Sequence, residues 1–145
     1  MYKRQIPFHL ATREFLELAR SRLAPGGTVS TNIIGAVRGP ESRLFRSMLR
    51  TYRAVFPTVA IHPVRGEGET GLEGIRNIIL VAGEGAAPSK EFLQERWAEL
   101  RKQSPGAPDL TVAIRGRVDC AVATEDVPVL TDDYAPTDAL LLLFG

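Results

Sequence analysis

The first clear pattern in the chain is an amphipathic helix followed at once by a strand. Apolar residues between Phe15 and Leu23 fall on one helical face, and the Pro-Gly-Gly at 25–27 cannot continue a helix. The β-branched residues of 28–34 then predict a strand. This pair is one half of a βαβ unit, and few residues remain before Phe15 for its opening strand. We therefore expect the sequence to begin inside a domain.

Two further helices are expected. Apolar residues repeat at helical spacing from 44 to 56, after the Gly-Pro-Glu at 39–41. The opposite face carries a row of arginines, which we interpret as a solvated face. These are Arg43, Arg46, Arg50 and Arg53. The second helix should begin after Ser89, bury Trp97 and end before the Ser-Pro-Gly at 104–106.

Two apolar runs, 58–62 and 76–82, predict strands, and the second run is apolar enough to be covered on both faces. Between them, 65–74 contains four glycines and three glutamates. No Gly-Lys-Ser/Thr follows it and its acidic residues would repel phosphate, so it is typical of a hairpin connection and not of a phosphate loop. Strands joined in this way run antiparallel. The run 110–114 fits a helix or a strand equally well.

Composition narrows the class of protein. The 145 residues are 44% hydrophobic and 24% charged, which is ordinary for one soluble globular domain. The net charge of +1 gives no overall field toward nucleic acid. A single cysteine, Cys120, and two distant histidines without an HExxH pattern predict no disulfide and no metal site, which fits a cytoplasmic protein. No apolar run approaches the ~20 residues that a membrane helix needs, and the longest is 139–144.

The first five residues, Met1–Gln5, fit poorly with the remainder of the chain. They match the translation of a transposon adapter used in preparing sequencing libraries. The alternative is a native basic arm. We therefore treat 1–5 as a non-native leader and 6–145 as one truncated domain.

Five segments together match a known pattern. They are IPFHLATREF at 6–15, LAPGGTVSTN at 23–32, VFP at 55–57, NIILVA at 77–82 and PVLTDDYAP at 128–136. In this order they resemble the C-terminal half of spermidine synthase-like proteins, the polyamine aminopropyltransferases and their relatives. LTDDYAP resembles most the divergent bacterial branch, whose members are often fused to a membrane domain.

The resemblance implies an α/β fold. We expect the C-terminal half of a Rossmann-type sheet of the kind found in S-adenosylmethionine-dependent methyltransferases, with a terminal antiparallel strand hairpin and a C-terminal helical extension. In that family the last strand is antiparallel and is inserted between the fifth and sixth.

The resemblance also implies a reaction, in which a diamine attacks the aminopropyl carbon of decarboxylated S-adenosylmethionine. The enzyme aligns the reactants and presents a neutral amine, whose proton a carboxylate accepts. The family's Gly-rich loop, ribose-binding acid and catalytic Asp are all expected before residue 6. We therefore expect no catalytic residue and no cofactor site in this chain, and inactivity on its own, whereas the parent would use decarboxylated or intact S-adenosylmethionine.

Binding residues carried over from the resemblance fall at two ends of the chain. Near the C-terminus, Asp132, Asp133 and Tyr134 would hold the ammonium group of a polyamine, unless the aspartates only cap a turn. Asn32 stands where the family carries a Gln and an acidic residue. The expected lid over the adenosyl group is formed by Pro7, Phe8, His9 and Leu10. This lid lacks the acidic and Gly-Pro features of authentic spermidine synthases.

Two alternatives stay open. The first is that the longer protein from which this chain derives is an S-adenosylmethionine-dependent methyltransferase, which the same half-fold would serve. Otherwise the chain is a noncatalytic α/β module that binds a partner strand along its sheet edge. In each case the absence of a preceding strand exposes the edge of the strand at 28–34, so we expect self-association through that edge.

Overall fold

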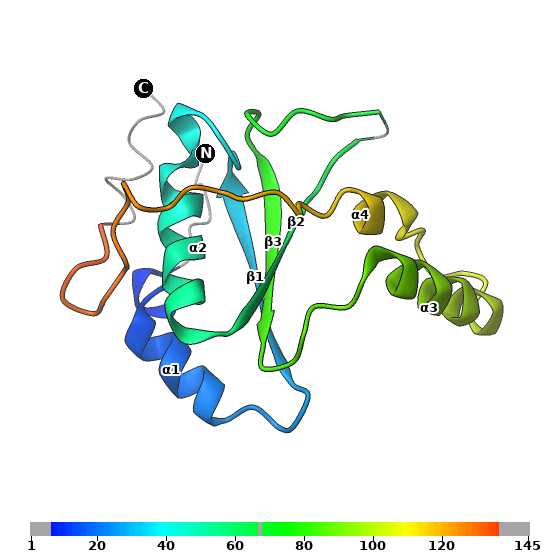
Figure 1. The fold of residues 1–145 in the computed structure, drawn as a ribbon, viewed down its shortest axis with the longest axis horizontal. Coiled ribbons are helices and arrows are strands. Elements are labelled where there is room, and N and C mark those ends of the chain that lie inside the picture. Colours follow the sequence, from blue (N-terminus) through cyan, green and yellow to red (C-terminus); the bar gives the residue numbers. More distant parts are fainter. Residues whose placement is uncertain (1–6, 67, 137–145) are drawn as a thin grey trace.

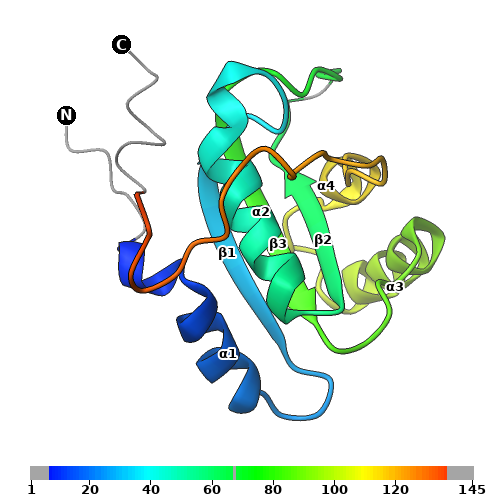
Figure 2. The ribbon, with the colours of Figure 1, turned by 60° about the vertical axis from the view of Figure 1, so that its left-hand side comes forward.

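The computed structural model describes residues 7–66 and 68–136, and Figure 1 shows their arrangement. The expected leader at 1–5 and the apolar run at 139–144 lie outside the described residues. A three-stranded sheet occupies the centre. Figure 2 shows α2 in front of this sheet and α3 and α4 behind β2.

The sheet has the strand order β1-β3-β2. β1 (Thr28–Gly35) and β2 (Thr58–Pro63) both pair antiparallel with β3 (Arg76–Gly83), so β1 and β2 run parallel to each other. The expected antiparallel hairpin of β2 and β3 is confirmed. The glycine-rich connection also contacts the end of β1, because the carbonyl of Leu72 accepts hydrogen bonds from the amides of Val37 and Arg38, at 2.9 and 3.1 Å.

The first helix, α1 (Arg13–Ser21), begins where the sequence predicts. The hydroxyl of Thr12 accepts a hydrogen bond from the amide of Phe15 at 3.3 Å, which satisfies one of the free N–H groups of the first turn. A short 3₁₀ helix, η1 (Phe8–Leu10), precedes it. After α1 the chain turns through Gly26, whose φ of 76° lies in the left-handed region that favours glycine.

The core lies between the sheet and α2 (Arg43–Val55), which follows a 3₁₀ turn, η2 (Pro40–Ser42). The hydroxyl groups of Tyr52 and Thr31 share a hydrogen bond between α2 and β1. Side chains of α2 and of all three strands are fully buried against one another, and α1 contributes one more. The largest are Tyr52, Phe45, Met48, Leu49, Leu16, Ile33, Ile78 and Leu80.

The interpretation of the arginine row on α2 as a solvated face is wrong for Arg46 and Arg50, which are half-buried, whereas Arg43 and Arg53 are exposed. Arg50 donates to the carbonyls of Thr124, Glu125 and Val127, at 3.3 and 3.0 Å for the first two. Arg53 donates to the carbonyl of Val122 at 3.1 Å. Arg46 contacts the same segment through the carbonyl of Ala123 and the carboxylate of Asp126. The residues at 122–127 join no described strand, so their carbonyls take charged donors instead.

The helical extension after the strands consists of α3 (Lys90–Gln103) and α4 (Thr111–Arg115). Ser89 caps α3 by accepting a hydrogen bond from the amide of Phe92 at 3.1 Å. The ambiguous run at 110–114 thus forms mostly helix, whereas 118–123 forms a single bridge, between Val118 and Ile61. None of the helices in the described residues has the length and apolar character needed to cross a membrane.

Candidate functional site

Two segments from opposite ends of the chain meet at the start of α1. The amide of Arg13 donates to the carbonyl of Leu130 at 2.8 Å, and the amide of Leu130 donates to the hydroxyl of Thr51 in α2 at 2.9 Å. Leu130 is fully buried. Figure 2 shows this C-terminal segment crossing α2 and reaching the beginning of α1. The burial and the two hydrogen bonds of Leu130 therefore anchor the candidate residues that follow it.

Those residues form a tight turn. Thr131 and Tyr134 exchange two backbone hydrogen bonds of 3.0 Å each, and the hydroxyl of Thr131 accepts a further one from the amide of Tyr134 at 3.2 Å. Asp132 and Asp133 occupy the two central positions with exposed side chains, and Tyr134 is 58% exposed. Thr131 therefore does the capping, and neither aspartate carboxylate bonds to another described residue. Both carboxylates point to solvent.

A third carboxylate, that of Glu14, belongs to the same corner. Its Oε2 accepts a hydrogen bond from the amide of Asp132 at 3.0 Å, and its Oε1 pairs with Arg13 at 3.1 Å. A hydrogen bond from its own amide lowers the pKa of Glu14 most, and the amide of Asp132 and Arg13 lower it further. Among the described residues, the corner thus holds the carboxylates of Glu14, Asp132 and Asp133, and Arg13 pairs with Glu14 and, at 3.7 Å, with Glu17. Sequence reasoning missed this role of Glu14, because the two segments are 118 residues apart.

The four lid candidates immediately precede this corner. Pro7 and the three residues of η1 are all exposed. The carbonyl of Pro7 accepts a hydrogen bond from the amide of Leu10 at 2.8 Å, which closes the 3₁₀ turn. The rings of Phe8 and His9 meet edge to face, with centroids 5.5 Å apart. The structure therefore brings the lid candidates and the 131–134 turn to the same end of α1.

Asn32 lies elsewhere. It is three residues before the end of β1, and its Nδ2 donates to Oδ1 of Asn77 at 3.0 Å. Thr31 contacts α2, and successive side chains of a strand point to opposite faces, so Asn32 points away from α2. The 131–134 turn lies on the α2 side, so Asn32 and the aspartates belong to different faces of the sheet.

The other reactive groups are the thiol of Cys120 and the side chains that could bind a metal ion. Within residues 7–66 and 68–136, no three His, Cys, Asp or Glu side chains are arranged to hold a metal ion. Cys120 is exposed, and its sulfur accepts a hydrogen bond from Arg38 at 3.2 Å. The chemistry that the described corner offers is therefore the binding of cations by carboxylates next to exposed aromatic rings.

Comparison with known proteins shows one structural similarity. No protein-family model matches the chain, and no curated protein sequence matches it significantly. Its fold is similar to the crystal structure of a probable spermidine synthase from Corynebacterium glutamicum ATCC 13032, with a TM-score of 0.51 and 21% sequence identity. The match covers 88% of this chain and 47% of that one, so this chain spans about half the length of the solved relative.

Proposed function

We propose that this chain is the C-terminal half of a spermidine synthase-like transferase, which moves an aminopropyl group from decarboxylated S-adenosylmethionine to a polyamine. The observation that carries the proposal is the sheet, in which an antiparallel β3 lies between parallel β1 and β2. This is the strand insertion that the resemblance implies, and the similarity over 88% of the chain to a probable spermidine synthase supports it.

The corner at the start of α1 would recognise the acceptor. An alkylammonium group prefers carboxylate oxygens, and the faces of aromatic rings add attraction. Asp132 and Asp133 supply exposed carboxylates that pair with no other described residue, with Glu14 beside them and Tyr134 exposed. The amine that attacks must lose its proton to a base, which we place before residue 6. The chain would therefore bind the distant ammonium group of the acceptor without catalysing transfer by itself.

The same sheet would serve an S-adenosylmethionine-dependent methyltransferase. The acidic corner favours the aminopropyltransferase, because among the described residues its carboxylates outnumber its one guanidinium, which suits a cationic acceptor.

Calorimetry on the full chain tests the acceptor site. Spermidine should bind saturably, and the double substitution Asp132→Asn with Asp133→Asn should weaken binding about tenfold or more, because two charge-assisted contacts are lost. Glu91→Gln is the matched control, since Glu91 is also acidic and exposed but lies on α3. If both variants weaken spermidine binding equally, binding depends on general charge attraction and not on this site, which would contradict the proposal.

Two further experiments test whether the chain is half of a domain. Decarboxylated S-adenosylmethionine should not bind saturably at micromolar concentration, and such binding would contradict a donor site before residue 6. The DNA preceding the Ile6 codon should continue in frame into a strand and a Gly-rich loop. A natural stop codon and a ribosome-binding site directly before Met1 would instead favour a noncatalytic module.

A further inference from the structure

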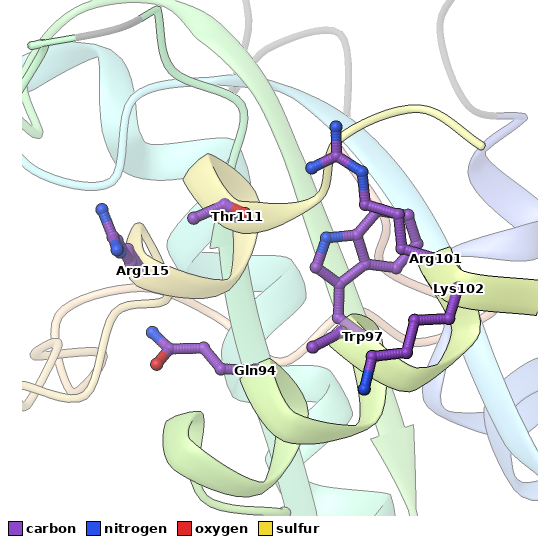
Figure 3. Close-up of a pocket in the computed structure, with 7 residues that line it drawn as sticks. Gln94, Trp97, Arg101, Lys102, Thr111 and Arg115 are labelled. Atoms are coloured by element: carbon purple, nitrogen blue, oxygen red, sulfur yellow. The ribbon is translucent and has the colours of Figure 1, made fainter. Parts of the chain in front are cut away.

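A cavity of about 440 Å³ opens between α3 and α4, on the other side of the sheet from the acidic corner. Figure 3 shows the side chains that surround it. Its size lies within the range of about 300–1,000 Å³ that is typical of small-molecule sites. The side chains that line it include Gln94, Trp97, Arg101, Lys102, Thr111 and Arg115.

The lining of this cavity is cationic. Arg101, Lys102 and Arg115 contribute three positive charges, and no carboxylate lines the cavity. Arg101 pairs with Asp109 nearby, at 3.3 Å between Nη1 and Oδ2. Lys102 and Arg115 form no ion pair within the described part of the chain. With Asp109 included, the groups around the cavity carry an excess of two positive charges.

The side chain of Trp97 forms one wall of the cavity. Trp97 is only 9% exposed, and its Nε1 is buried without a hydrogen-bond partner in the described residues. Buried N–H groups are nearly always hydrogen-bonded in folded proteins. Figure 3 shows this nitrogen on the side of the ring that faces Thr111, beneath the guanidinium of Arg101. This nitrogen has almost no accessible surface, so the indole ring, and not its N–H group, faces the cavity.

Asp109 is the acidic group beside the indole nitrogen. Its Oδ1 accepts a hydrogen bond from the amide of Thr111 at 2.9 Å, and its Oδ2 pairs with Arg101. Hydrogen bonds from Thr111 lower the pKa of Asp109 most, and Arg101 and Trp97 contribute less. The carboxylate stays ionised at neutral pH, yet the indole makes no hydrogen bond of normal geometry to it.

We propose that this cavity binds the phosphate group of a small phosphorylated molecule, with Arg101, Lys102 and Arg115 as countercharges and the indole ring of Trp97 as an apolar wall. A phosphate monoester carries nearly two negative charges at pH 7, which matches the excess of two positive charges. Planar guanidinium groups bind phosphate oxygens in pairs. The remaining volume, near Gln94 and Thr111, accommodates a small organic group.

Nuclear magnetic resonance of the full chain tests this site directly, because Trp97 is the single tryptophan and gives one indole N–H signal. The probes are phenyl phosphate, inorganic phosphate and benzoate. Phenyl phosphate should move the signal saturably, and phosphate alone should do so at higher concentration. Benzoate has the same ring with one negative charge and should bind much more weakly. An indole signal that stays fixed, or that responds equally to benzoate and phenyl phosphate, would overturn the proposal.

Variants then separate the site from general charge attraction. Arg115→Gln should weaken phenyl phosphate binding about tenfold, because one charge-assisted contact is lost. Lys102→Gln provides a second, exposed position with the same expectation. The matched control is Arg96→Gln, since Arg96 is on α3 but is 60% exposed and pairs with Glu99 outside the cavity. Equal weakening by the control and the two cavity variants would overturn the proposal.

Discussion

At the scale of single residues, His62 shows how tertiary contacts set a protonation state. It lies on β2, on the face opposite the core, where α4 and the segment after it pack. Burial lowers its pKa most, and the positive charges of Arg117 and Lys90 lower it further. Asp119 and a hydrogen bond with the backbone of Ala113 act in the opposite direction. His62 is therefore neutral in the folded state over a wider pH range than in the unfolded chain.

This difference predicts an acid-dependent loss of stability. The unfolded histidine has a pKa of about 6.5, so on acidification the unfolded chain binds a proton more readily than the folded chain. The free energy of unfolding should therefore fall as the pH drops from about 7.5 to about 5.5, a range that extends about one pH unit to each side of that pKa. His62→Gln should remove this part of the pH dependence in urea denaturation. The control is His9→Gln, which leaves His62 in place. A His62→Gln profile identical to that of the unmodified chain would contradict this role.

Some residues of the candidate site could be predicted from the sequence and others could not. Asp132, Asp133 and Tyr134 follow from a sequence motif, and the structure places them on an anchored turn next to the lid candidates. Glu14 follows from no motif, because its contact with Asp132 forms only when α1 meets the C-terminal segment. Asn32 illustrates the opposite case. Its position in β1 was predictable, but the face to which it points depends on where α2 packs.

At the scale of elements, α2 has two functions. Its apolar face forms the core, and its arginine row holds the segment 122–127 to the domain surface. The sequence predicted both faces, but it gave no sign that carbonyl groups from a segment about 75 residues later would cover the polar one.

Arg50 donates the most hydrogen bonds from this row to the segment 122–127, so its loss should be costly. Arg50→Gln should lower the free energy of unfolding by about 2 kcal/mol, because charged hydrogen bonds to backbone carbonyls are lost. The matched control is Arg43→Gln, since Arg43 is exposed on the same helix and should cost less than about 0.5 kcal/mol. Chemical denaturation measures both values. Similar losses in the two variants would show that the contacts with 122–127 contribute nothing to stability.

At the scale of the whole molecule, one side of the sheet is less covered than the sequence predicts. The apolar run at 76–82 suggested burial on both faces, yet Ile79 and Val81 are only half-buried, and Ile34 beside them is 51% exposed. Among the described strands β1 pairs only with β3, so its other edge presents unpaired backbone groups. An apolar, unpaired edge of this kind favours pairing between copies.

Self-association through β1 is therefore expected and is open to a paired test. Ile34→Lys places a charge on the edge strand and should shift the chain from oligomer toward monomer in light scattering after size-exclusion chromatography. Ile75→Lys is the control, because Ile75 is 50% exposed and precedes β3 instead of lying on β1. A chain that is already monomeric and melts cooperatively would contradict the expectation, as would equal effects of the two substitutions.

The sequence by itself determined the helices α1, α2 and α3, the three strands and the antiparallel hairpin, because periodicity, capping residues and Pro-Gly breaks act over a few residues. It left 110–114 undecided, since a five-residue apolar run satisfies both periods. Only the tertiary structure decided which segments meet: the carboxylates at the start of α1, the arginines over 122–127 and the cations around Trp97. These depend on contacts between distant residues, which local patterns do not encode.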